Sequence, residues 1–141
     1  MTPSLTFMVV AVVVIGVVLL VIIGATRGRG GALDQEKYRE NWLKIENNLD
    51  KNNLATYQFA VLAADKLLDQ ALRDSGAKGE KMSDRLKDFA KKFSRDTLNQ
   101  IWAAHKLRNQ IAHETDSQVN LLGARRALAT YKKALKELGA I

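Results

Sequence analysis

The first part of the chain contains one long apolar run. Residues 5–25 hold no charged side chain, and only Thr6 and two glycines interrupt the apolar sequence. A helix of about 20 apolar residues is long enough to cross the hydrocarbon core of a bilayer. A cleavable signal peptide would have a basic start and a shorter apolar stretch, whereas the opening segment MTPS has no basic side chain. We therefore predict an uncleaved transmembrane anchor over residues 1–26.

The charges beside this run predict its orientation. Arg27 and Arg29 follow it directly, and no charged side chain precedes it. Positively charged flanks stay on the cytoplasmic side of a membrane span. The sequence thus predicts a single-pass membrane protein with a cytoplasmic C-terminal domain. Residues 27–32, which include three glycines, are predicted to form a flexible linker.

Beyond the linker, apolar residues recur at intervals of three and four, as on one face of a helix. No stretch shows sustained period-two alternation, so strands are not predicted. The expected helices cover 34–49 with Asp34 as N-cap, 54–74, a stretch capped by Ser83 that bends at 94–97 and continues past Trp102, and 121–138 closed by Gly139. Thr115 and Gln118 have capping-box spacing before the last of these.

The predicted fold class is therefore all-α. Four or five amphipathic helices with short connections form an antiparallel bundle over residues 33–141. The large aromatic residues fall on the apolar seams and are expected to anchor the core rather than to stack on bases: Trp42, Tyr57, Trp102 and Tyr131.

Composition excludes several kinds of chemistry and suggests an anionic partner. The chain has no cysteine and only two histidines, so disulfides, thiolate catalysis and a structural zinc site are not expected, and no cofactor is predicted. Lys and Arg number 22 against 15 Asp and Glu, and all of them follow Thr26. This balance suits RNA or lipid headgroups, and it equally suits ordinary solubility.

The most basic stretch is KGEKMSDRLKDFAKKFSR, residues 78–95. Its seven cations alternate with Glu80, Asp84 and Asp88, which favours a solvated helix face. If it meets RNA, binding should weaken steeply with salt, and on a short tether it could instead contact anionic lipid.

Both histidines lie in IWAAHKLRNQIAHE, residues 101–114. Arg108, Asn109 and His113 offer a phosphate-binding cation, an amide and a proton-transfer group. These are the groups that metal-independent RNA cleavage by a 2′-hydroxyl requires. On a straight helix, however, Arg108 and His113 lie about 140° apart. Either the helix ends near Ala112, or a second chain completes the site.

The segment LRNQIAHE resembles the Arg-x(4–6)-His motif of the HEPN superfamily, in its Arg-Asn-x-x-x-His form. The helices on either side of the motif resemble the HEPN arrangement over about residues 33–139. The resemblance implies a metal-independent endoribonuclease of toxin or defence type, acting as a homodimer with a composite site. Arg108 and His113 match the catalytic pair and Asn109 the polar position after Arg. His105 and Glu114 lie outside that pattern and are expected at most to orient the catalytic side chains. The anchor is not part of the usual HEPN domain.

The sequence-based hypothesis is thus a membrane-anchored, HEPN-like ribonuclease that acts on RNA as a homodimer. A neutralising protein partner, if one exists, is not identifiable from the sequence. One alternative is a non-catalytic helical module that binds a partner through the same surface. Another is a membrane-tethered adaptor in which Arg108 and His113 are simply the polar end of a helix.

Overall fold

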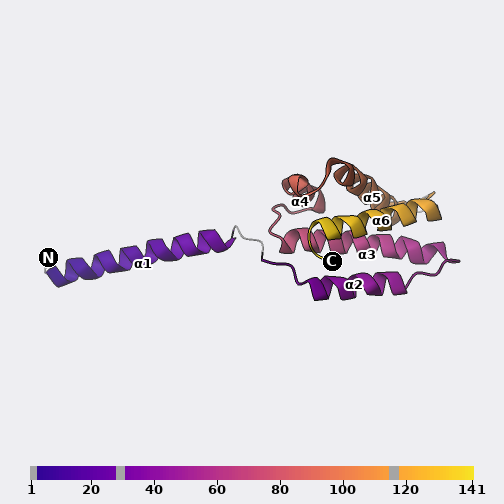
Figure 1. Cartoon of the computed structure of the whole chain (residues 1–141). Coiled ribbons are helices and arrows are strands. Elements are labelled where there is room, and N and C mark those ends of the chain that lie inside the picture. Colours follow the sequence, from indigo (N-terminus) through magenta and orange to yellow (C-terminus); the bar gives the residue numbers. More distant parts are fainter. Residues whose placement is uncertain (1–2, 28–30, 115–117) are drawn as a thin grey trace.

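The computed structural model describes residues 3–27, 31–114 and 118–141, and every regular element in these ranges is helical (Figure 1). The predicted all-α class is confirmed. The elements are α1 (Pro3–Arg27), α2 (Gln35–Asn47), α3 (Leu54–Asp74), α4 (Met82–Asp88), the 3₁₀ turn η1 (Ala90–Lys92), α5 (Arg95–His113) and α6 (Leu121–Glu137).

Helix α1 stands apart from the bundle formed by the other helices (Figure 1). Its segment Pro3–Ile23 is long and apolar enough to cross a membrane, and none of its most apolar window is buried inside the structure. A signal sequence would pass the same test of length and composition. The orientation of the span remains a prediction, and Arg29 with the central linker residues lies outside the described residues.

Local side-chain caps explain where the first bundle helices begin. The Asp34 carboxylate accepts from the Lys37 backbone N–H, as predicted, and Asn53 caps α3 in the same way through Ala55. Each cap satisfies an N–H group that would otherwise lack a partner in the first turn.

The prediction of Ser83 as a helix cap is wrong. Helix α4 begins at Met82 and its N-cap is Lys81, so Ser83 lies inside the first turn. The reason is local: the Asp84 carboxylate accepts from the Lys81 N–H, which fixes the start of the helix two residues earlier. The helix is interrupted in this region, but earlier than the predicted bend at 94–97: η1 follows α4, Ser94 caps a separate helix, and residues 95–97 already belong to α5.

Helix α6 is capped by Asn120, whose side chain accepts from the Gly123 N–H. Thr115, proposed above as part of a capping box, lies outside the described residues. Gly139 follows the helix with a φ of +76°, a left-handed conformation that glycine adopts without strain. The prediction that Gly139 closes this helix is confirmed.

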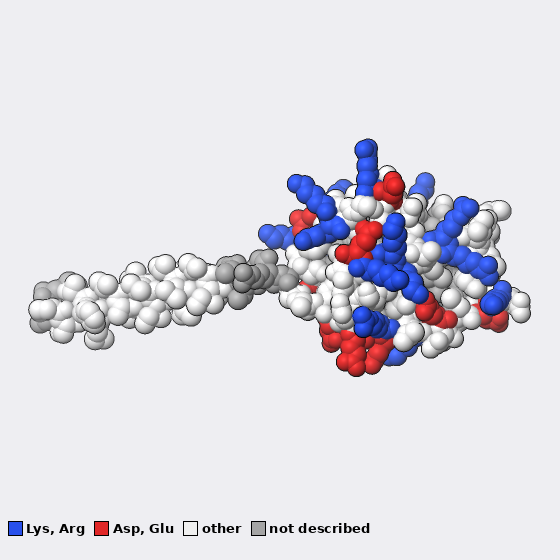
Figure 2. All heavy atoms as spheres, viewed as in Figure 1, with Lys and Arg blue, Asp and Glu red and all other residues white. Residues whose placement is uncertain are grey.

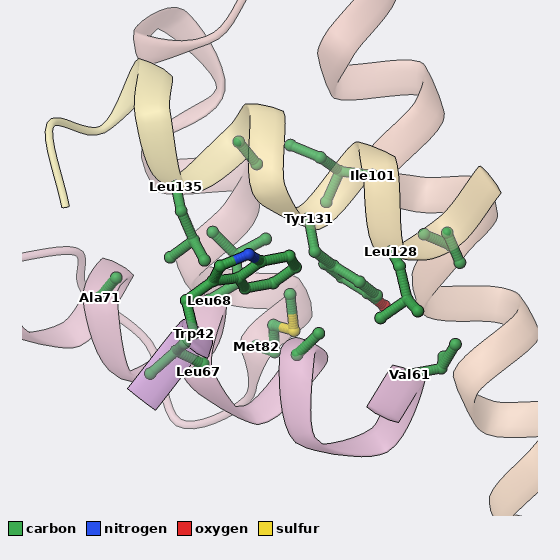
Figure 3. Close-up of a cluster of buried hydrophobic side chains, with 14 of the residues drawn as sticks. Trp42, Val61, Leu67, Leu68, Ala71, Met82, Ile101, Leu128, Tyr131 and Leu135 are labelled. Carbon is green, nitrogen blue, oxygen red and sulfur yellow. The ribbon is translucent and has the colours of Figure 1, made fainter. Parts of the chain in front are cut away.

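Helix α3 is the centre of the bundle and packs against α2, α4, α5 and α6. Figure 3 shows side chains from all of these helices meeting around it. Trp42, Tyr57 and Tyr131 are buried, as expected for core anchors, and Trp102 is half-buried against the same core. The largest side chains with no exposed surface include Leu68, Leu72, Ile101 and Leu135.

Truncation of Leu68 tests this core. The Leu68→Ala variant is expected to lose about 2–5 kcal/mol of stability, because it removes buried surface and leaves a cavity. Urea unfolding of the full chain in detergent, followed by tryptophan fluorescence, measures this loss, since both tryptophans lie in the bundle. Leu122→Ala is the control: its side chain is 56 % exposed, and its removal should change stability by less than about 0.5 kcal/mol.

Candidate active site: a polar cleft between α3, α4 and α5

Two of the three predicted catalytic residues lie together in one cleft. Arg108 and Asn109 line an open cleft of about 1060 Å³ between α5, α3 and the start of α4. The Arg108 Nη1 donates to Asn109 Oδ1 over 2.9 Å, which fixes the two side chains relative to each other. About a third of the Arg108 side chain remains exposed. A guanidinium held in this way can still present N–H groups to an anion in the cleft.

The floor of this arrangement is a buried carboxylate, Asp65 on α3. Its Oδ1 accepts from the Tyr131 hydroxyl over 2.8 Å and lies 2.8 Å from His105 Nδ1. Its Oδ2 lies 3.4 Å from Arg108 Nε. A carboxylate that is only 5 % exposed needs such partners, because an unpaired buried charge is very costly. The network joins α3, α5 and α6 directly beneath the cleft.

The sequence interpretation missed Asp65, although a signal was present. Asp65 lies four residues after Val61 and three before Leu68, on the most buried face of α3. A lone acidic residue on an apolar helix face must find a buried partner, so its position alone marks it as unusual. Tyr131 was expected in the core and is there, but the role of its hydroxyl was not foreseen.

His105 lies in the wall of the same cleft as Arg108, with its side chain 17 % exposed. The bond to the Asp65 carboxylate favours the tautomer with the proton on Nδ1, which leaves the lone pair on Nε2. The edge of the ring also contacts Trp102, with centroids 6.5 Å apart. A carboxylate that orients an imidazole is a common means of positioning a proton-transfer group.

His113 is placed differently from Arg108. It is the last residue of α5, it is exposed, and it is not among the residues that line the cleft. The helix ends close to Ala112, as expected, but His113 is still its last helical residue, so this end does not turn His113 towards Arg108. Of the two ways to bring Arg108 and His113 together, a helix end or a second chain, only the second chain remains.

Glu114 also lies away from the cleft. It follows α5 as the C-cap, and its N–H donates to the Gln110 carbonyl over 2.9 Å. Its side chain borders a separate hollow beside the start of α6. Glu114 therefore does not contact Arg108 or Asn109 within the chain.

The rest of the cleft carries charges of both signs. Arg85 is buried and donates to both carboxylate oxygens of Asp69, at 2.7 and 2.9 Å, and to the Gly79 carbonyl. The hydrogen bonds to Asp69 raise the pKa of Arg85, and this pair holds α4 against α3. Lys66, Lys81 and Glu80 line the rim of the cleft, and all three are exposed. Cations at the rim and Arg108 within suit a phosphodiester better than a neutral ligand.

Among the described residues, no group of three or more His, Asp or Glu side chains is arranged to hold a metal ion.

Alkaline pH is expected to lower the free energy of unfolding through Tyr131, whose hydroxyl donates to Asp65 beneath the cleft. Burial, together with Asp65, raises the pKa of the Tyr131 phenol far above its ordinary value of 10.0. Below about pH 10 the phenol is protonated in both the folded and unfolded chain, so stability is unaffected. Above it the unfolded chain releases the proton more readily, and stability falls as pH rises.

Urea midpoints between pH 9 and 11 measure this loss, and Tyr131→Phe should make the decline shallower. Some decline should persist in that variant, because burial and the bond to Asp74 also raise the pKa of Tyr38. A decline of unchanged steepness would show that Tyr131 does not contribute.

The comparisons with known proteins add no family to this description. No family model, no curated protein and no solved structure matches the chain. The HEPN resemblance therefore depends on the motif at residues 107–114 and on the helices around it.

Proposed function

We propose that this protein is a membrane-anchored, metal-independent endoribonuclease of HEPN type that works as a homodimer. The observation that carries the proposal is the position of Arg108 and Asn109, held side by side in the wall of an open cleft. Arginine forks onto phosphate oxygens and stabilises the negative charge that develops during phosphoryl transfer. The cytoplasmic location proposed for the bundle follows from Arg27 and Arg29 after the span.

The proposed reaction needs no group beyond the RNA and the protein. A base removes the proton from a ribose 2′-hydroxyl, and the oxygen then attacks the adjacent phosphorus. The bond between phosphorus and the 5′-oxygen breaks, and an acid gives that oxygen a proton. The products are a 2′,3′-cyclic phosphate and a 5′-hydroxyl. In this scheme Arg108 binds the phosphate and Asn109 orients it.

His113 is the proposed acid and base, and it would come from the second chain. The support for a second chain is geometric: His113 and Arg108 lie on one unbroken helix, about 140° apart around its axis. A twofold dimer in which the two α5 ends exchange partners would bring His113 of one copy to Arg108 of the other. Anchoring both copies in one membrane would favour such a pairing by raising their local concentration.

A second candidate is a non-catalytic module that binds RNA or another anionic partner in the same cleft. It is favoured by one observation, the absence of His113 from the residues that line the cleft. In that case Arg108 would contribute affinity alone, and no product would form under any condition.

Digestion of mixed RNAs by the full chain in detergent micelles tests the proposal. The reaction is run with chelator, and the product ends are analysed for 2′,3′-cyclic phosphate. Arg108→Gln should slow cleavage about 10²–10³-fold, because one stabilising group for the developing charge is lost. Lys106→Ala, an exposed change on the same helix, should leave the rate unaltered. Equal cleavage by wild type and Arg108→Gln would identify a contaminating nuclease and remove the proposal.

A further inference from the structure

The short connection between α1 and α2 fixes which end of the bundle lies nearest the anchor. Helix α1 ends at Arg27 and α2 begins at Gln35, so only residues 28–34 join them. Seven residues span at most about 25 Å when fully extended. The Gln35 side chain donates to the Gly139 carbonyl over 3.0 Å, which places the start of α2 beside the end of α6. Whatever surrounds this end of the bundle is held close to the membrane surface.

A cluster of exposed cations lies at this same end. We call it the basic turn, and it consists of Lys87, Lys91, Lys92 and Arg95, all exposed. It is attached to the end of α6, because Glu137 accepts from the Ser94 N–H over 3.2 Å and from the Thr97 hydroxyl over 2.7 Å. Figure 2 shows Lys and Arg side chains gathered over the region where Figure 1 places α4, next to the basic turn in sequence.

Carboxylates beside the basic turn reduce its positive charge. Asp88 is the only acidic residue between Lys87 and Arg95, and it accepts from the Lys78 N–H over 2.8 Å. Glu137 is bonded to Ser94 and Thr97, as described above. The donors to Asp88 and Glu137 are neutral N–H and O–H groups, so both carboxylates keep their charge, as does the exposed Asp96 in the first turn of α5. The four cations of the basic turn still outnumber these three carboxylates where the tether holds them.

We propose that the basic turn binds anionic phospholipid headgroups of the membrane in which α1 is anchored. Basic segments next to a membrane span are attracted to an anionic leaflet within a distance of about 10 Å. The tether makes this contact intramolecular, so even weak individual attractions suffice to hold the bundle down. RNA could also bind these cations. The short connection to α1 favours the lipid, because it keeps the basic turn close to the membrane surface at all times, whereas RNA must diffuse to it. The proposal depends on α1 crossing the membrane and not on nuclease activity.

The absence of cysteine makes a direct test possible, because one introduced cysteine gives one labelling site. The full chain is reconstituted in nanodiscs that carry a trace of headgroup-labelled acceptor lipid. A donor dye is placed at Asn99→Cys, one turn beyond the basic turn, or at Asn52→Cys, in the loop between α2 and α3 at the far end of the bundle. Energy transfer then reports how near each end lies to the lipid.

Adding phosphatidylserine to phosphatidylcholine nanodiscs should increase energy transfer from position 99 and not from position 52. The variant Lys91→Gln/Lys92→Gln/Arg95→Gln should reverse this increase. Each cation contributes roughly fivefold to the ratio of docked to free bundle, so removal of three should lower it about 100-fold at low salt. The matched control Lys44→Gln/Lys51→Gln/Arg126→Gln, which removes three exposed cations elsewhere, should retain the increase.

Two further measurements make the result decisive. Raised salt should lower energy transfer from position 99 in phosphatidylserine nanodiscs, because it releases the bundle from the lipid surface while α1 stays anchored, and this test does not depend on the folding of a basic-turn variant. Equal energy transfer in the two lipid mixtures, or an unchanged signal in the basic-turn variant, would overturn the proposal. So would a variant that loses RNA binding in phosphatidylcholine nanodiscs while keeping its response to phosphatidylserine, because the basic turn would then be an RNA surface.

Discussion

Replacement of His113 by alanine is expected to slow RNA cleavage about 10²–10⁴-fold, because a positioned acid and base contributes a factor of this size. The fold should be unaffected, since His113 is exposed at the end of α5 and, within the described part of the chain, its side chain makes no hydrogen bond or ion pair. The rate is measured from the appearance of 2′,3′-cyclic phosphate ends with the full chain in micelles. Urea unfolding of the same variant confirms that any loss of rate is not a loss of structure.

A mixture of two inactive variants tests whether the site is shared between chains. Arg108→Gln and His113→Ala are co-expressed and purified together. If Arg108 of one chain works with His113 of the other, each mixed dimer holds one complete site. About half of the dimers are mixed, so roughly a quarter of the wild-type rate should return. If each site lies within one chain, both copies remain defective and no activity returns.

His105 is the alternative proton-transfer group, because it lies in the cleft with Arg108 and is oriented by Asp65. Full activity in His113→Ala, together with loss of activity in His105→Asn, would transfer the acid–base role to His105 and exclude His113. Since His105 is part of the buried network, the stability of His105→Asn must be measured beside its rate.

Replacement of Asp65 by alanine is expected to destabilise the bundle by about 3–5 kcal/mol, because each buried donor left without its acceptor costs about 1–3 kcal/mol. The change leaves the buried Tyr131 hydroxyl without its acceptor and removes the carboxylate beside His105 and Arg108. Urea unfolding followed by the fluorescence of Trp42 and Trp102 measures the loss. Unlike the substitution of His113, this one should lower stability and activity together.

Two controls separate the network from its parts. Tyr131→Phe removes only one donor and should cost about 1.5–3 kcal/mol, the range for a hydrogen bond to a charged group. Glu40→Ala removes an exposed carboxylate from α2 and should change stability by less than about 0.5 kcal/mol. A loss below about 1 kcal/mol in Asp65→Ala would mean that the network does not bear on the stability of the bundle.

Much of the secondary structure could be predicted from the sequence, because helix formation and capping depend on residues close together in the chain. The intervals of three and four predicted α2, α3 and α6, and Asp34 and Gly139 marked a start and a stop correctly. Ser83 is not the cap because Lys81, two residues earlier, takes the N-cap position of α4. The Asp84 carboxylate accepts from the Lys81 N–H and so fixes the start of the helix there. The spacing of apolar residues alone does not show which of two neighbouring residues will be the cap.

The candidate site could be predicted only in part. The motif identified Arg108 and Asn109, and the helical angle showed that His113 would not meet Arg108 on one straight helix. The sequence did not reveal that His105 and residues of α3 and α4 line the same cleft as Arg108 and Asn109. Which surfaces face each other across the bundle depends on how the helices pack, and that information is spread over the whole core.

The sequence by itself determined an apolar helix able to span a membrane, an all-helical domain behind it, and a guanidinium, an amide and an imidazole on one helix. Those features follow from composition and from local periodicity. Only the tertiary structure decided that His105 and Tyr131, which lie 40 and 66 residues after Asp65 in the sequence, both bind its buried carboxylate. The physical reason is that a helix fixes the direction of each side chain, whereas the packing of α3 against α5 and α6 selects what that side chain meets.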